Sequence, residues 1–400
     1  MDGMQPGAMA GVGELTRRHR DTIMHSFPCP NCRRLNHFEV RVCPNCSATL
    51  GYDPEIDAFR FLADQATAWH APDGSIADVV VCANNNDYQI CNWLVAADAP
   101  NGLCRACRHN RTIPDLSEPG VPERWAKIEA AKRRLFHTLI KLSLPLETKA
   151  EERAGVQGLA FDFLYDPAAE HEGRAAVMTG HDDGLITLNL IEADDGEREK
   201  LRHAMGEPYR TLLGHFRHEV GHHYWSRLVE PDDAELAAFR AVFGDERADY
   251  EEALQAHYAD DGSKVWTDAH VSFYATSHPW EDFAETFAHY IHIVDVLATA
   301  RGFDLSLDAL PNDLASVVEL DFNPYIASTA DLAQAMRPLS FAMNAINRSM
   351  GQPDLYPFHL SDTIIGKLDF IRQLAAKARA SSCSQAEEVA PNAPSPMAMA

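Results

Sequence analysis

Apolar side chains recur at helical spacing through most of the chain beyond residue 120, which predicts a mainly helical domain there. Residues 123–142 form one such pattern. Residues 209–230 form another, which ends before Pro231 because proline cannot continue a helix. Residues 232–270 are acidic and also helical in pattern. Residues 303–375 predict helices that break at four prolines, namely Pro311, Pro324, Pro338 and Pro353.

Strand-like patterns are confined to short runs of residues. Alternation of apolar and polar side chains is typical of a half-buried strand, and we expect strands at 37–42, 76–81, 159–165 and 185–191. A few short strands beside many helices indicate an α+β fold that is mostly helical.

Composition divides the chain into segments. Residues 1–24 and 376–400 contain few large apolar side chains, so we expect both to be disordered. Residues 113–122 contain three prolines and predict a linker. We therefore expect two cysteine-containing modules, at 25–55 and 56–112, ahead of a helical domain at 123–375.

The strongest chemical signal lies inside the helix predicted at 209–230. His218 and His222 are four residues apart, so they share one helix face and both imidazoles can reach one metal ion. Glu219 follows His218, and its carboxylate can accept a proton from metal-bound water. Three fixed positions arise by chance in roughly one chain of this length in twenty. The alternative is a pair of histidines on an ordinary helix face.

A hydrolytic zinc site needs a third protein ligand and an open position for water. No third histidine stands six residues after His222, because that position is Leu228. Residues 274–292 offer carboxylates instead, and Glu281 and Glu285 lie one helical turn apart. Carboxylates on a buried helix face need a partner, which a metal ion and its histidines would provide. The spacing leaves both glutamates open as the third ligand.

The HEVGH stretch at 218–222, followed by Y-x-x-x-x-P-x-E-x-F-A-E at 274–285, resembles the gluzincin metallopeptidases, in particular their lethal-factor-like branch. This resemblance implies that Glu281 is the third zinc ligand and that the Tyr274 hydroxyl stabilises the oxyanion. It also implies that Glu285 orients a ligand histidine.

A closer resemblance covers roughly residues 25 to 375. The stretches YRTLLGHFRHEVGHHYW, HPWEDFAETFAHYIHIVD and YPFHLSDTIIGKLDFI resemble a bacterial family described as "putative zinc-binding metallopeptidase", which carries an N-terminal zinc ribbon. This resemblance implies a zincin-like peptidase fold but no particular substrate. In gluzincin-like folds an edge strand aligns extended substrate, and residues 185–191 are our candidate for that strand.

Eight of the nine cysteines fall before residue 110. The first four form two C-P-x-C turns and predict a structural zinc site, namely Cys29, Cys32, Cys43 and Cys46. The next four form a second candidate site, namely Cys82, Cys91, Cys104 and Cys107. The spacing of Cys82 and Cys91 is less usual, so His70 or His109 is an alternative for one ligand.

Charge narrows the choice of partners. The net charge of −24 arises entirely within residues 150–400, which hold 18 basic and 42 acidic side chains. This acidity disfavours nucleic acid as the main partner. The first 20 residues lack the apolar core of a signal peptide, and no segment has the apolar length of a membrane span. We therefore expect a cytoplasmic protein whose cysteines are reduced and bound to metal, with no membrane partner. The oligomeric state stays open.

These observations predict a zinc metallopeptidase that acts on a protein or peptide substrate, with one catalytic zinc ion and one or two structural ones. Zinc-activated water would attack the peptide bond while Glu219 acts as the general base. One alternative is a catalytically silent or latent zincin scaffold that recruits a protein through its zinc ribbons. A further alternative, ranked below it, is a nucleic-acid-binding regulator that uses the ribbons.

Overall fold

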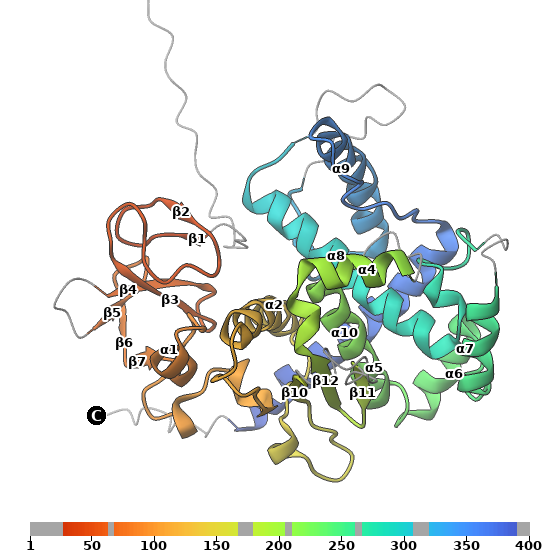
Figure 1. The fold of residues 1–400 in the computed structure, drawn as a ribbon, viewed down its shortest axis with the longest axis horizontal. Helices are drawn as coiled ribbons and strands as arrows, with labels where there is room; N and C mark the ends of the chain where they lie inside the picture. The colour runs from red at the N-terminus through yellow and green to blue at the C-terminus, as the bar shows by residue number, and fades with distance from the viewer. Residues whose placement is uncertain are drawn as a thin grey trace, which may run out of the picture.

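The computed structural model describes residues 27–62, 68–166, 179–204, 210–260, 266–306 and 320–389. Small sheets form the N-terminal ribbon region, and helices form most of the remaining domain (Figure 1). Helix α2 (Val121–Lys141) lies between the two. This architecture confirms the expected α+β fold. The segment predicted to be disordered at 1–24 lies outside the described residues.

The ribbon region is built from short antiparallel strands. Strand β1 pairs with β2, strands β3 to β6 form a four-stranded meander, and β7 pairs with β8. Their bounds are β1 Phe27–Pro28, β2 Leu35–Asn36, β3 Thr49–Asp53, β4 Ala58–Leu62, β5 Trp69–His70, β6 Ile76–Ala77, β7 Val79–Val81 and β8 Leu94–Ala96, with α1 (Ala83–Tyr88) between the last two.

The strand predicted at 37–42 is wrong. Residues 37–40 form a turn, in which the Val40 N–H donates to the His37 carbonyl at 3.1 Å. Phe38 points into an aromatic cluster, where its ring centroid lies 4.8 Å from that of Tyr52. Inward packing of one aromatic side chain therefore replaces the extended pairing that the alternation had suggested.

The ribbon region packs directly on helix α2. His137 of α2 lies among the aromatic rings of the ribbon, 5.4 Å from Phe38 by ring centroids. Asp57, in the turn between β3 and β4, lies 2.9 Å from His137 Nε2 and accepts a hydrogen bond from Lys141 Nζ at 2.7 Å. Apolar packing and a charged contact thus both hold the ribbon against the helical domain.

A second four-stranded sheet belongs to the helical domain, with strand order β11–β12–β10–β9. Strand β10 (Ala160–Leu164) runs parallel to both β9 (Asn110–Thr112) and β12 (Leu185–Asn189). Strand β11 (Gly180–Asp182) pairs antiparallel with β12 and forms the edge. The segment 185–191 is therefore not an edge strand, because β12 has a partner on each side.

Most of the remaining helices lie above this sheet and to its right in Figure 1. They are α4 Asp195–Ala204, α5 Leu212–Leu228, α6 Asp233–Phe243, α7 Tyr250–Ala259, α8 Pro279–Gly302, α9 Thr329–Ser349 and α10 Asp362–Val389. Short 3-10 turns follow β12 (η4, Leu190–Ala193) and precede α8 (η5, Tyr274–Thr276). Helix α5 packs against α8 and α2, and its Phe216 is fully buried against Phe161 of β10.

Two helical boundaries differ from the sequence expectation. Pro338 lies inside α9 rather than at a break, and its burial with Met336 and Leu339 offsets the backbone hydrogen bond it cannot donate. Helix α10 runs to Val389 although we expected disorder from residue 376, and Ala378 is buried within it.

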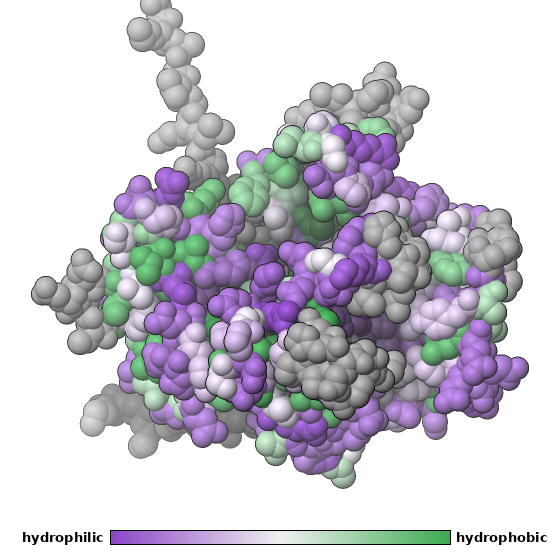
Figure 2. Space-filling view, viewed as in Figure 1, coloured by the Kyte–Doolittle hydropathy of each residue, from purple (hydrophilic) through white to green (hydrophobic). Residues whose placement is uncertain are grey.

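Hydrophilic residues prevail on the face drawn in Figure 2, and apolar ones gather over the ribbon region and below α9. None of the helices in the described part of the chain is both long and apolar enough to cross a membrane.

Candidate metal centre and active site

The site is formed where helices α5 and α8 cross at close range. Thr211 caps α5 by accepting a hydrogen bond from the Gly214 N–H at 2.9 Å. Helix α8 begins with Pro279, a residue suited to the first helical turn. At the crossing, a Cβ on Gly221 would lie only 2.9 Å from the Ala284 Cα. Glycine in the HEVGH stretch therefore allows the two backbones to approach closely.

This approach brings three ligand-type atoms together. His218 Nε2 lies 3.1 Å from His222 Nε2 and 3.0 Å from Glu281 Oε2, and His222 Nε2 lies 3.4 Å from the same oxygen. A zinc ion about 2.0–2.1 Å from each atom of a tetrahedral set would separate them by about 3.3 Å. Glu281 Oε2 is buried and receives no hydrogen bond. The three atoms thus face a common point, as the ligands of one ion do.

The group has three members among the described residues, so a tetrahedral ion would keep a fourth position for water or substrate. All three side chains are buried, and the donor set of two imidazoles and one carboxylate is one that zinc prefers. The residues present therefore fit a catalytic zinc ion.

Further polar groups form contacts with the candidate ligands His218 and Glu281 through atoms that do not face the cluster. Glu285 Oε1 lies 2.7 Å from His218 Nδ1, the nitrogen that faces away from the cluster. Ser272 donates a hydrogen bond to the other oxygen of Glu285 at 2.6 Å. Tyr250, at the start of α7, donates to Glu281 Oε1 at 2.6 Å. Such contacts fix the orientation of metal ligands.

Glu219 projects from α5 beside the cluster and is in contact with a histidine. His215 Nε2 lies 3.1 Å from Glu219 Oε1, and His215 Nδ1 lies 2.5 Å from Glu192 Oε2. Burial alone would lower the pKa of His215, but the two carboxylates outweigh it and raise that pKa to about 10. Burial would likewise raise the pKa of Glu219, but the neighbouring histidines lower it to about 2. Glu219 is therefore ionised and able to accept a proton.

Tyr274 lies in η5 next to the cluster, with its ring centroid 5.8 Å from that of His218. Burial, together with the negative charge of Glu281, raises the pKa of this phenol well above its ordinary value. The hydroxyl therefore stays protonated and can donate a hydrogen bond.

The edge strand β11 lies against the same part of α5. The His181 ring is stacked 6.1 Å from the His222 ring, and Trp280 covers His222 at 3.7 Å. Burial lowers the pKa of His181 to about 4, so this imidazole is neutral. Among the described strands, β11 is thus an edge strand placed next to the candidate metal site.

The two cysteine sets each form a compact cluster. Cys29 and Cys46 sulfurs lie 3.7 Å apart, Cys32 and Cys43 sulfurs 3.6 Å, and Cys91 and Cys104 sulfurs 3.8 Å. These separations are far longer than a disulfide bond. A zinc ion about 2.3 Å from four tetrahedral sulfurs would separate them by about 3.8 Å. Both clusters, with Cys82 and Cys107 completing the second, therefore fit structural zinc.

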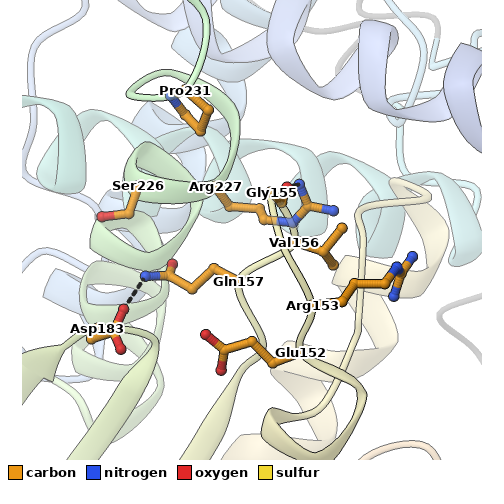
Figure 3. Close-up of a pocket in the computed structure, with 9 residues that line it drawn as sticks. All are labelled: Glu152, Arg153, Gly155, Val156, Gln157, Asp183, Ser226, Arg227 and Pro231. Carbon is orange, nitrogen blue, oxygen red and sulfur yellow. Dashed lines mark hydrogen bonds between the residues drawn. The ribbon is translucent and has the colours of Figure 1, made fainter.

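A pocket of about 210 Å³ lies beyond the C-terminal end of α5 (Figure 3). Charged and polar side chains from the loop at 152–157, together with Asp183, Ser226 and Arg227, line it, and Gln157 donates to Asp183 at 2.8 Å. None of its lining residues belongs to the metal cluster, so we do not place the chemistry there.

The structure brings together the side chains that the sequence singled out for the hydrolytic site, on α5, η5 and α8. It separates the roles of the two glutamates, because Glu281 faces the cluster while Glu285 faces the far nitrogen of His218. The sequence analysis assigned no role to Glu192, Tyr250 or His215. The position of His215 one helical turn before Glu219 was the available signal.

Comparison with known proteins agrees with this picture. Residues 122–374 match the family described as "Putative zinc-binding metallo-peptidase", and residues 26–118 match a zinc-ribbon domain. Uncharacterized proteins of Mycobacterium tuberculosis and Mycobacterium bovis are 42% identical over 349 residues, which cover 87% of this chain and 94% of each relative. No solved structure matches. The chain thus belongs to the zinc-binding metallo-peptidase family, with a zinc-ribbon domain ahead of its peptidase region.

Proposed function

We propose that this protein is a zinc-dependent peptidase that cleaves peptide bonds beside α5. The observation that carries the proposal is the convergence of His218, His222 and Glu281 on one point, next to the ionised carboxylate of Glu219. A binding scaffold would not need a proton acceptor and a phenol donor beside a three-ligand site.

When bound, zinc supplies an activated water molecule and polarises the substrate carbonyl. Glu219 accepts the proton of the attacking water and passes it to the leaving amine, as a general base and then a general acid. Tyr274 donates a hydrogen bond to the carbonyl oxygen as negative charge develops on it. Glu285 keeps His218 in the tautomer that presents Nε2 to the site.

The substrate chain would pair with β11. Within the described part of the chain this strand pairs only with β12, and its His181 lies beside His222. An extended peptide that adds to the free edge would gain backbone hydrogen bonds and pass over the metal ligands. We therefore assign substrate alignment to β11 in place of 185–191.

The test compares new protein N-termini in cells that express the wild type or Glu219→Ala. Zinc content of the two purified proteins provides the control, because Glu219 is not among the three ligand candidates. Termini that appear only with the wild type, at equal zinc content, would support a peptidase and identify its substrates. Identical sets of termini would overturn the proposal and favour the scaffold alternative.

A further inference from the structure

Three largely buried side chains, those of Glu219, His215 and Glu192, contact one another in series between α5 and the end of β12. Glu192 in η4 contacts His215 Nδ1 at 2.5 Å, and His215 Nε2 contacts Glu219 Oε1 at 3.1 Å. The side chains of Glu192 and Glu219 are 6% and 7% exposed, and that of His215 is 18% exposed. An ionised carboxylate can only accept hydrogen bonds, so an imidazole that bonds to two ionised carboxylates donates from both nitrogens. The chain therefore consists of a cation between two anions.

The far end of this chain is anchored to backbone. Thr179 Oγ1 donates to the second oxygen of Glu192 and accepts a hydrogen bond from the Asn189 N–H at 3.1 Å. Both oxygens of Glu192 are thus occupied, and its position is fixed by the end of β12 and the turn that follows. The orientation of His215 is consequently set by the sheet rather than by α5 alone.

We propose that His215, held by Glu192, is a positioning residue for the general base Glu219. The contact occupies Glu219 Oε1, which leaves Oε2 as the oxygen that meets the attacking water. His215 touches neither the three ligand atoms nor the reacting atoms, so its effect passes through Glu219. This inference rests on the proposed peptidase function.

Without the contact to His215, the Glu219 side chain could adopt other rotamers. An error of about 1 Å in the placement of a reacting group can cost about 100-fold in rate. We therefore expect His215→Leu to lower kcat by about 10- to 100-fold with little change in KM. His215→Gln keeps two N–H donors on one nitrogen and should recover part of that loss. Glu192→Gln should give an intermediate loss, because a neutral amide orients the imidazole less strongly.

The experiment combines kinetics with a measurement that needs no substrate. Kinetics use a quenched peptide that spans a cleavage site found with the wild type. Crystal structures of the zinc-loaded wild type and His215→Leu report the side-chain conformation of Glu219. His223→Leu serves as the matched control, because it also removes a buried imidazole from α5 but lies outside this chain of contacts. Zinc content should stay equal in all variants.

The outcomes separate this inference from the proposed function. Altered Glu219 conformation and a kcat loss in His215→Leu, absent in His223→Leu, would support the positioning role. If Glu219→Ala abolishes cleavage while His215→Leu keeps both the kcat and the Glu219 conformation, the positioning role is overturned and the peptidase assignment stands. If Glu219→Ala cleaves normally, the peptidase mechanism itself fails.

Discussion

Gly221 controls the distance between the two helices that form the metal site, so its substitution by alanine is an informative perturbation. The added Cβ would lie 2.9 Å from the Ala284 Cα and 3.1 Å from the Ala284 carbonyl oxygen. Both atoms belong to the backbone of α8 and cannot rotate away. An ordinary contact needs about 3.6 Å between carbon atoms, so the helices must separate by about 0.7 Å.

Two effects on stability oppose each other in Gly221→Ala. Alanine favours the helix by about 1 kcal/mol relative to glycine. Overpacking a tight contact costs about 1–3 kcal/mol. The net destabilisation is therefore small, about 0–2 kcal/mol. The effect on zinc is larger, because Glu281 lies one turn before Ala284 and moves with it. A shift of about 0.7 Å exceeds the tolerance of about 0.2 Å on a ligand bond, and we expect zinc affinity at this site to fall at least about 10- to 100-fold.

The assay is chelator competition for zinc, with thermal unfolding measured in parallel. His222→Ala identifies which phase of zinc loss belongs to this site, as distinct from the cysteine clusters. Gly366→Ala in α10 is the matched control, because no atom lies within 4 Å of its added Cβ. It should stabilise the protein by about 1 kcal/mol and leave zinc binding unchanged. The reasoning is refuted if Gly221→Ala behaves like Gly366→Ala in both measurements.

Three further predictions concern groups around the site and at the ribbon junction. Glu285→Gln should weaken zinc binding at the hydrolytic site by about 10- to 100-fold, as measured by the same competition, because His218 loses its carboxylate partner. Tyr274→Phe should lower kcat by about 100- to 1,000-fold at unchanged zinc content, and equal rates would exclude its role as oxyanion donor. Burial alone would raise the pKa of Asp57, but His137 and Lys141 lower it to about 2. Because its pKa is depressed in the folded state, ionised Asp57 stabilises the fold above about pH 4. This stabilisation is lost as the pH falls from about 4 to 2. Asp57→Asn should therefore cost about 2 kcal/mol near neutral pH and nothing at the acid end, as urea unfolding at several pH values can show.

Local periodicity predicted those parts of the site that lie on one helix. The spacing of His218 and His222 places them on one face whatever surrounds the helix, and the paired cysteine turns are equally local. The choice between Glu281 and Glu285 could not be made from spacing. It depends on how far α8 slides along α5, which the contact between Gly221 and Ala284 sets.

Contacts between segments far apart in the chain could not be predicted from the sequence. Glu192 meets His215 across 23 residues, and Tyr250 meets Glu281 across 31. No repeat or motif links the members of either pair. The strand order was also missed: β12 is an inner strand because it pairs with β10 on one side and with β11, which precedes it, on the other.

The position of β9 has a consequence for how the protein is made. This strand begins three residues after Cys107, and Asn110 within it bonds to Glu129 and Lys132 of α2. The Cys107 sulfur lies 3.8 Å from the same Glu129. All four cysteines of the second cluster are therefore made before α2 and β10, the partners of β9, so zinc can bind there before β9 docks. Under zinc starvation during synthesis, the ribbon and the peptidase region would fail to mature together, so metal supply would limit the amount of folded protein as well as its occupancy.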